Sequence, residues 1–421
     1  MSDSRHLAVL WLVLIIGIRP AFCGDWPRFR GPNGAGTSTD RDVPIEINSK
    51  ANLLWRVAIP GSGNSSPIVA DGRIFLQSAS SDGSERRILC LSLEDGRTIW
   101  DQTAPGTDVN LHKRSSLASG TGAAGAGRVF MPCWDGQRLA LAAYDFEGNS
   151  LWNVDLGTFK AEFGAGHSPI VVGDLVILAN DQDGTSEIVA LNAQDGSVAW
   201  KKSRRAFKVC CYSTPLILEQ PGEEPDLLVV SAAGVTGYDP RDGTEKWSWL
   251  WTTNDKSLRI ISSPIVSQGM LFFTAGNGPG ERQAVAVRLD GRAGELPASQ
   301  LAWEARKVFP YIPCLLAKGE HLYFVNDAGI AGCYVARTGR KVWEQRLGVG
   351  DVTASPVLVA DRIYAVSETG SIRVFAADTV FKRLSEGSLD ETVRATPAVA
   401  DGRLLIRGTE HLYCFGKKYR P

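Results

Sequence analysis

The sequence predicts an all-β protein, an eight-bladed β-propeller of four-stranded antiparallel blades whose ring is closed by the N-terminal strand. Two short motifs recur along the chain at intervals of 41 to 55 residues. The 44 glycines, 21 prolines and 12 tryptophans, with 44% hydrophobic residues, indicate many short strands joined by tight turns. A period near fifty residues with several short strands is typical of propeller blades.

The first motif is a Ser/Thr-Pro step, an apolar pair, a turn and an alternating strand. It reads SSPIVADGRIF at Pro67 and HSPIVVGDLVI at Pro169. We expect each copy to form the two inner strands of one blade. The other copies are centred on Gly122, Pro215, Pro264, Pro313, Pro356 and Pro397.

The second motif is an apolar strand, a Gly-containing turn and a strand with a tryptophan, as in LEDGRTIW. We expect these rings to pack over the facing turn of a neighbouring blade. The tryptophans in this slot are Trp55, Trp100, Trp152, Trp200, Trp247, Trp303 and Trp343. Trp134, Trp249 and Trp251 lie outside the slot, which makes them the better candidates for stacking on a ligand.

The last copy of the first motif, at Pro397, is followed by HLYCFG without a tryptophan strand. The strand ANLLWRVAI, with Trp55, precedes the first copy, so we expect it to pair with His411–Phe415 and close the ring. The expected organisation is a signal peptide (1–23), an N-terminal arm (24–50), the propeller (51–416) and a C-terminal tail (417–421).

The N-terminus has the pattern of a secretory signal. Arg5 and His6 precede an apolar run over residues 7–18, and Ala21 and Cys23 occupy the small-residue positions of a cleavage site. The run is too short to span a bilayer of about 30 Å. We therefore expect a protein exported to the periplasm or the extracellular space and cleaved near Cys23. Lipid attachment at Cys23 and a retained membrane anchor are the alternatives.

The 45 basic and 46 acidic residues give a net charge of -1. Such a balanced chain has no long-range field that would recruit nucleic acid or an anionic membrane. We expect no nucleic-acid partner, no membrane span and a monomer.

The repeat SPIVADGRIF…LEDGRTIW resembles that of the pyrroloquinoline-quinone-like (PQQ-like) propellers, which include the quinoprotein alcohol dehydrogenases and BamB-like proteins. The segments DWPRFRGPNGAG, YSTPLI, GYDPRDGTEKW, NDAGIAGCYVARTGRKVW and GTEHLYCFG resemble more closely a group of exported planctomycete propellers. The resemblance covers nearly the whole chain after residue 23 and implies the fold, but fold alone does not determine function.

Cys210 and Cys211 are adjacent in FKVCCYSTP, in a loop expected to rim the channel mouth. Methanol-dehydrogenase-type enzymes carry such a pair against their quinone, so the resemblance implies a possible redox pair. A disulfide between adjacent residues is strained. Three interpretations of Cys210 and Cys211 stay open: a redox pair at a cofactor, a structural disulfide, or two free thiols. Cys90, Cys333 and Cys414 are expected to be core thiols.

The same loops carry cations that could bind an anionic ligand, a polysaccharide or a protein. The candidate ligand-binding residues are Lys113, Arg114, His167, Arg204, Arg205, Lys208, Arg259, Arg306 and Tyr311. Asp351, Asp390 and Glu391 lie on the opposing arc, so the face is expected to have a basic and an acidic half. The alternatives are a solvated rim and, for His167, a structural hydrogen bond.

The sequence shows no catalytic constellation and no haem or zinc motif. The one substantial insertion, residues 103–125, holds a single carboxylate, Asp108. The leading hypothesis is a non-catalytic, cofactor-free propeller that binds a ligand or protein through its loop face. The alternative is a small dehydrogenase of alcohols or sugars that depends on PQQ and calcium.

Overall fold

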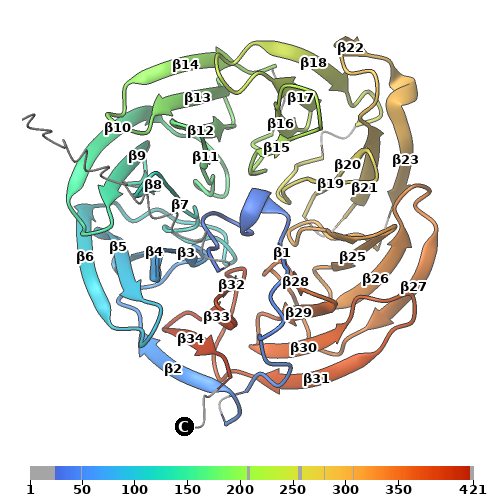
Figure 1. Cartoon of the computed structure of the whole chain (residues 1–421). Helices are drawn as coiled ribbons and strands as arrows, with labels where there is room; N and C mark the ends of the chain where they lie inside the picture. The colour runs from blue at the N-terminus through green and yellow to red at the C-terminus, as the bar shows by residue number, and fades with distance from the viewer. Residues whose placement is uncertain are drawn as a thin grey trace, which may run out of the picture.

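The computed structural model describes residues 24–48, 50–205, 209–254, 258–278, 280–306 and 308–417. It confirms the predicted eight-bladed β-propeller: eight antiparallel sheets of four principal strands surround a central axis (Figure 1). The 23 N-terminal residues expected to form a signal peptide lie outside the described residues.

Blades 1 to 4 follow the chain in order, each from the innermost to the outermost strand. Blade 1 contains β3 (Ile68–Ala70), β4 (Arg73–Ala79), β5 (Glu85–Ser92) and β6 (Thr98–Pro105). Blade 2 contains β7 (Ala123–Gly125), β8 (Arg128–Trp134), β9 (Arg138–Asp145) and β10 (Ser150–Thr158). Blade 3 contains β11 (Ile170–Val172), β12 (Leu175–Asn180), β13 (Glu187–Asn192) and β14 (Val198–Ser203). Blade 4 contains β15 (Leu216–Leu218), β16 (Asp226–Ser231), β17 (Gly234–Tyr238) and β18 (Glu245–Leu250), with β22 (Gly294–Leu296) added in parallel at its outer edge.

Blades 5 to 8 complete the ring. Blade 5 contains β19 (Ile265–Ser267), β20 (Met270–Gly276), β21 (Arg282–Arg288) and β23 (Leu301–Arg306), and the short helix η2 (Ala298–Gln300) precedes β23. Blade 6 contains β24 (Leu316–Lys318), β25 (His321–Val325), β26 (Ile330–Val335) and β27 (Lys341–Arg346). Blade 7 contains β28 (Val357–Val359), β29 (Arg362–Val366), β30 (Ser371–Ala376) and β31 (Arg383–Ser388). Blade 8 contains β32 (Ala398–Ala400), β33 (Arg403–Arg407), β34 (His411–Phe415) and the N-terminal β2 (Leu53–Ala58).

The predicted closure is confirmed by the pairing of β2 with β34. The two strands are antiparallel, with Ala58 opposite His411 and Leu53 opposite Phe415. The first described strand of the ring therefore supplies the outer strand of the last blade, and no blade edge is left open at the junction of the chain ends.

The Gly-Trp pattern of the repeat has a direct packing cause. Gly96, in the turn after β5, adopts a φ of 74°, and a Cβ at this position would lie 2.7 Å from the ring of Trp55 on the preceding blade. The glycine thus leaves the space that the tryptophan fills. The same contact recurs between Gly148 and Trp100. It is also found for Gly196 with Trp152, Gly243 with Trp200 and Gly339 with Trp303.

The N-terminal arm, residues 24–48, runs across the centre of the ring in Figure 1. It contains η1 (Pro32–Gly34) and β1 (Thr37–Ser38), and β1 pairs in parallel with the innermost strand of blade 7. Trp26 bridges to Val69 in blade 1. The Asn33 side chain exchanges two hydrogen bonds with the backbone of Ile217 in blade 4. The arm therefore joins opposite sides of the ring.

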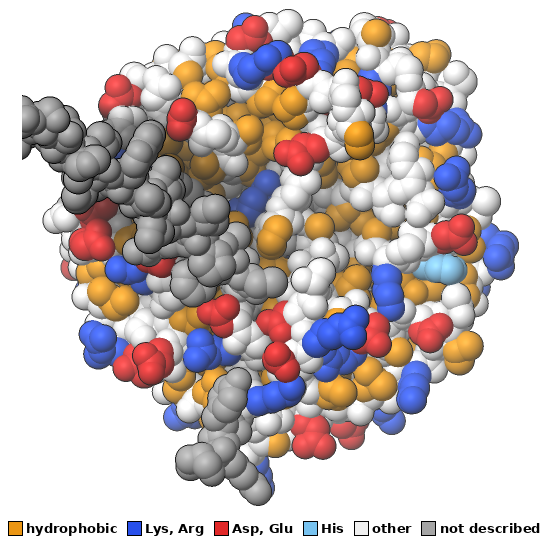
Figure 2. All heavy atoms as spheres, viewed as in Figure 1, with side chains coloured by type: hydrophobic (Ala, Val, Ile, Leu, Met, Phe, Trp, Pro, Cys, Tyr) orange, Lys and Arg blue, Asp and Glu red, His pale blue; other side chains and the backbone are white. Residues whose placement is uncertain are grey.

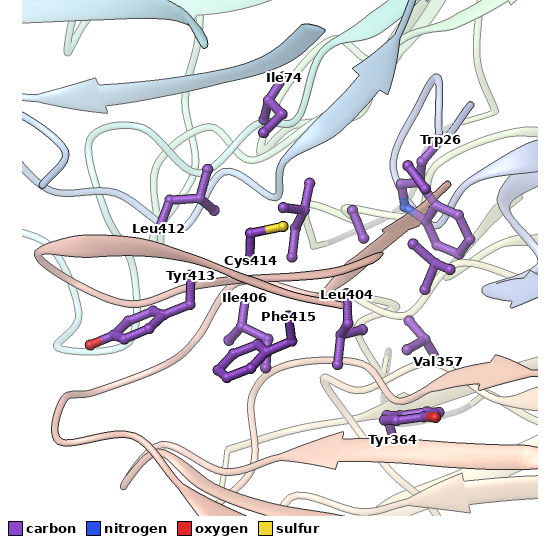
Figure 3. Close-up of a cluster of buried hydrophobic side chains, with 14 of the residues drawn as sticks. Trp26, Ile74, Val357, Tyr364, Leu404, Ile406, Leu412, Tyr413, Cys414 and Phe415 are labelled. Atoms are coloured by element: carbon purple, nitrogen blue, oxygen red, sulfur yellow. The ribbon is translucent and has the colours of Figure 1, made fainter. Parts of the chain in front are cut away.

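Part of the hydrophobic core includes the arm. Trp26 is 1% exposed and belongs to the cluster formed by blades 7, 8 and 1 (Figure 3). Tyr364, Leu404 and Phe415 are fully buried in the same cluster. Residues 24–48 are thus a structural part of the propeller, although they lie outside its repeat.

Candidate functional site

The antiparallel order of each blade defines two faces. Turns between first and second strands lie on the face that the arm crosses, where Asp40 accepts a hydrogen bond from the backbone of Gly402. This is the arm face, which Figure 2 shows with charged side chains around its rim. The loops that lead into each innermost strand, and those between second and third strands, lie on the opposite face. This loop face is where the sequence predicts ligand binding.

A ring of hydrogen bonds surrounds the axis near the loop face. It is formed by the Ser or Thr before the repeat proline, by Thr121 before Gly122 and by Cys314 after Pro313. We call it the collar: Ser66, Thr121, Ser168, Thr214, Ser263, Cys314, Ser355 and Thr396. The backbone N–H of one collar residue donates to the side chain of the collar residue in the next blade, at 3.0–3.1 Å in seven of these steps. The Ser/Thr of the repeat therefore joins blades together.

At the remaining step, between Ser168 and Thr214, a histidine spans the seam. His167 Nε2 lies 2.9 Å from the carbonyl oxygen of Cys211 and donates to it. The imidazole is 3% exposed and stacks on Tyr212, with ring centroids 5.4 Å apart. Burial lowers the pKa of His167 to about 4, although the backbone carbonyls oppose this effect. His167 is therefore a neutral, buried hydrogen-bond donor at neutral pH.

Cys210 and Cys211 are free thiols in the structure, and their side chains pack in different hydrophobic clusters. Cys210 Sγ lies 3.0 Å from the carbonyl oxygen of Asp181, whereas Cys211 Sγ accepts the backbone N–H of Ala232 at 3.3 Å. Their exposed fractions are 0% and 1%. Burial raises the pKa of Cys211 to about 12 and also raises that of Cys210. Neither thiol faces an open channel.

Arg204 does not contribute to an exposed basic arc, contrary to expectation. It is buried and its Nε lies 2.5 Å from Asp181 Oδ1. Burial by itself lowers the pKa of Arg204, but the adjacent Asp181 carboxylate raises it above the ordinary value. The neighbouring Arg205 is exposed and lies 4.0 Å from Glu295. Lys208 lies outside the described residues.

Arg259 and Tyr311 do converge, across the seam of blades 4, 5 and 6. The Arg259 guanidinium lies over the ring of Phe163 at 4.5 Å and also pairs with Glu162 at 3.2 Å. Tyr311 is 7% exposed, and Arg282 lies over its ring. Burial raises the pKa of the Tyr311 phenol, and the nearby Arg259 partly offsets this. These residues are packed together rather than open to a ligand.

Arg114 forms ion pairs between the basic arc and the acidic arc, which the sequence predicts on opposite halves of the loop face. Its Nη2 lies 2.5 Å from Asp351 and its Nε lies 2.9 Å from Glu368. Asn64 donates to the carbonyl oxygen of Arg114 at 2.8 Å, which holds the same loop over the junction of blades 8 and 1. The insertion therefore crosses part of the channel mouth, and its charge is neutralised there.

Two residues of the expected acidic arc have partners nearby, Asp351 in Arg114 and Glu391 in blade 8, whereas Asp390 is exposed. Glu368 pairs with Arg394 as well as Arg114. Glu391 accepts hydrogen bonds from His411 and Tyr413 in its own blade. Lys113 and Arg306 are exposed and form no ion pair within the described part of the chain. As far as the structure describes it, the loop face is thus a mixed surface with few free cations, not a bowl divided into two charged halves.

The tryptophans pack between and within blades and do not line a ligand-binding site. Six of the seven slot residues donate their indole N–H to a backbone carbonyl of the next blade: Trp55, Trp100, Trp152, Trp200, Trp303 and Trp343. Trp247 instead donates to Asp226 in its own blade. Trp134, Trp249 and Trp251, the candidates for ligand stacking, are 7%, 2% and 4% exposed and belong to the core.

The cavity found at the loop face beside His167 is too small to hold a quinone. The cavity beside His167 and the insertion has a volume of about 10 Å³, which is the space of a single water molecule and far smaller than a tricyclic quinone. Within the described residues, no three His, Cys, Asp or Glu side chains are grouped to hold a metal ion such as calcium. A hollow of about 670 Å³ lies on the arm face beside Trp26, Thr37 and Asp40. Its lining contains no part of the predicted site.

The fold, the repeat and the closed ring define a PQQ-like β-propeller. The chain belongs to the family described as outer membrane protein assembly factor BamB, whose model matches residues 35–141, 137–306 and 297–382. A protein from Yersinia pestis named outer membrane protein assembly factor BamB is 23% identical over 308 residues, which is 66% of this chain and 71% of that protein.

Solved structures show the same fold. BamB from Moraxella catarrhalis superposes with a TM-score of 0.61 at 15% identity, over 88% of this chain and 98% of that one. Quinohemoprotein alcohol dehydrogenase from Comamonas testosteroni superposes with a TM-score of 0.63 at 14% identity, over 94% and 82%. Within the described residues, no helix is long and apolar enough to cross a lipid bilayer.

Proposed function

We propose that this chain is an exported, non-catalytic propeller that binds a protein partner through its loop face. The observation that carries the proposal is the packing of the channel mouth, where Arg114 ties the insertion to Asp351 and Glu368. A small ligand needs a concave pocket that buries most of its surface. A protein partner needs only an accessible face of adequate area.

The accessible cations of this face favour a partner with acidic or polar side chains. Lys113, Arg205 and Arg306 are exposed and come from three different loops or strand ends. Charges at the rim of an interface mainly steer association and select the partner. An acidic polysaccharide is the second ligand class that such a surface could bind.

The relatives support the same assignment. The Yersinia pestis protein is named as an assembly factor of outer membrane proteins. The signal-like pattern of residues 1–23 supports export to the compartment where such assembly takes place. We infer that the partner is an envelope protein rather than a small metabolite.

The alternative, a PQQ- and calcium-dependent dehydrogenase, shares the fold. The described residues do not fit that group, because both thiols of the Cys210-Cys211 pair are buried and the cavity next to His167 holds about 10 Å³. Among the residues that the structure describes, no specific contact favours the dehydrogenase.

Site-specific photo-crosslinking in secreting cells tests the proposal. A photoreactive residue is placed at Arg205 or Arg306 on the loop face, and at Asp174, in an exposed turn on the arm face, as the matched control. We expect discrete crosslinks to an envelope protein from the loop-face positions and none from Asp174. Crosslinks only from Asp174, or none from any position, would contradict the proposal.

A further inference from the structure

Three arginines near the axis are buried without a carboxylate partner. Arg28 and Arg30 come from the arm and Arg407 from the end of β33, and their exposed fractions are 8%, 0% and 1%. Among the described residues, these guanidinium groups donate only to backbone carbonyl oxygens, and each has at least one nitrogen without a hydrogen-bond partner. All three guanidinium groups reach the backbone beside the collar.

The two arm arginines reach the collar at positions two blades apart. Arg28 Nη2 donates to the carbonyl of Pro215 at 2.5 Å, next to collar residue Thr214, while its Nε has no partner. Arg30 Nη2 donates to the carbonyl of Leu315 at 2.7 Å, next to collar residue Cys314, while its Nη1 has no partner.

Arg407 approaches the collar from blade 8. Its Nη1 donates to the carbonyl oxygens of Ser65 at 2.8 Å and Gln77 at 2.7 Å, and Ser65 is next to collar residue Ser66. Its Nε and Nη2 are buried without a partner. A Cβ at Gly63 would lie 3.0 Å from Nη2, so the glycine leaves space beside the unpaired nitrogen.

Two other buried arginines of this chain have a partner for every guanidinium nitrogen. Arg204 pairs with Asp181. Arg86, at 4% exposure, donates from Nε, Nη1 and Nη2 to three backbone carbonyls, those of Trp134, Gly83 and Thr107. Arg204 and Arg86 thus show that a buried guanidinium group of this chain can have all its nitrogens partnered. The Nε atoms of the part-buried Arg73, Arg128 and Arg362 also lack a partner, but these three side chains are less buried than Arg28, Arg30 and Arg407.

Such an arrangement is costly without a counter-charge. Burial lowers the pKa of Arg28 and Arg407 to about 9 and also lowers that of Arg30. Arginine nevertheless stays protonated in proteins, and an isolated buried cation has a large desolvation penalty. A bound anion removes this penalty and accepts from the free N–H groups.

The collar adds hydroxyl groups as further hydrogen-bond donors. Six of its hydroxyls, on Ser66, Thr121, Ser168, Ser263, Ser355 and Thr396, accept a backbone N–H. An accepting hydroxyl keeps its own O–H free to donate. We propose that the unpaired guanidinium nitrogens of Arg28, Arg30 and Arg407 form anion-binding positions beside the collar, which bind small inorganic anions of the halide or phosphate class.

Thermal unfolding of the full chain at fixed ionic strength tests this. In sodium gluconate, stepwise replacement by chloride, and separately by phosphate, should raise the midpoint with the logarithm of anion concentration, as for a ligand that binds only the folded state. The anion that acts at lower concentration identifies the class. Variants R28M, R30M and R407M should lose part or all of this slope, and R86M, a buried arginine with carbonyl partners on all three guanidinium nitrogens, should keep it.

A wild-type crystal soaked in bromide provides a second readout that does not depend on variant folding. We expect anomalous peaks within hydrogen-bond distance of Arg28 Nε, Arg30 Nη1 or Arg407 Nη2. Midpoints that do not respond to either anion would overturn the proposal. So would bromide bound only at the outer surface, or an equal slope in all variants.

Discussion

The Arg114 guanidinium lies 2.5 Å from the Asp351 carboxylate, although the two residues are 237 positions apart. Arg114 belongs to the insertion between blades 1 and 2, and Asp351 to the loop between blades 6 and 7. Glu368 in blade 7 pairs with the same guanidinium. These ion pairs connect loops from different sides of the ring. They hold the insertion over part of the channel mouth.

Replacing Arg114 with Met should loosen the insertion with little effect on overall stability. Exposed ion pairs contribute about 0–1 kcal/mol to unfolding, and the Asp351 side chain is 64% exposed. Hydrogen exchange should therefore increase over residues 106–118 while the melting temperature changes little. R241M, which removes an exposed pair with Asp239, is the control. Unchanged exchange over residues 106–118 would mean that other contacts hold the insertion.

Removing the Trp26 ring should destabilise the whole propeller. Trp26 is 1% exposed in a cluster shared by three blades, and Trp→Ala in a core typically costs about 3–5 kcal/mol. Urea unfolding of W26A should show a loss in that range. Truncation of Trp343, whose indole lies at the periphery, should cost less. A W26A loss below about 1 kcal/mol would show that the arm is separable from the core.

The repeat and the ring closure could be predicted because every blade repeats the same local chemistry. A turn glycine beside a docking tryptophan, as with Gly96 and Trp55, leaves a signature in sequence. The arm could not be placed in this way, because Trp26 and Arg30 have no counterpart in the repeat. Their partners in blades 1 and 6 are set by tertiary structure alone.

Acidification should destabilise the protein through His167. Its pKa is about 4 in the folded state and 6.5 ordinarily, so the unfolded chain binds the additional proton between these values. Unfolding free energy should fall by up to about 3 kcal/mol as pH decreases from 6.5 to 4. H167Q should lose this dependence, and H112Q, at an exposed position, should keep it. A pH profile that is the same in H167Q and wild type would contradict the assignment.

Thiol labelling distinguishes the readings left open for Cys210 and Cys211. Because both side chains are buried and their pKa values are raised, neither should react in the native protein. Both should react in denaturant without reductant, as should the buried core thiol Cys90. Peptide mapping after labelling locates the modified residues. If this pair stays unlabelled until reductant is added, the two cysteines are bonded.

The candidate site could be predicted less well than the fold. Arg204 and Arg205 are neighbours in sequence, yet one is buried against Asp181 and the other is exposed. Loop composition does not contain this information, because burial depends on which carboxylate the fold brings near. Arg114 and Asp351 were expected on opposing arcs for the same reason.

The most direct test of the proposed function is a titration of the full chain with PQQ in the presence of calcium, followed by calorimetry and by dye reduction with alcohols and sugars. A quinoprotein alcohol dehydrogenase apoprotein provides the positive control. The packed loop face, with its cavity of about 10 Å³ and its buried cysteine pair, predicts no stoichiometric binding and no dye reduction. Saturable one-to-one binding with substrate-dependent dye reduction would contradict a non-catalytic, protein-binding propeller.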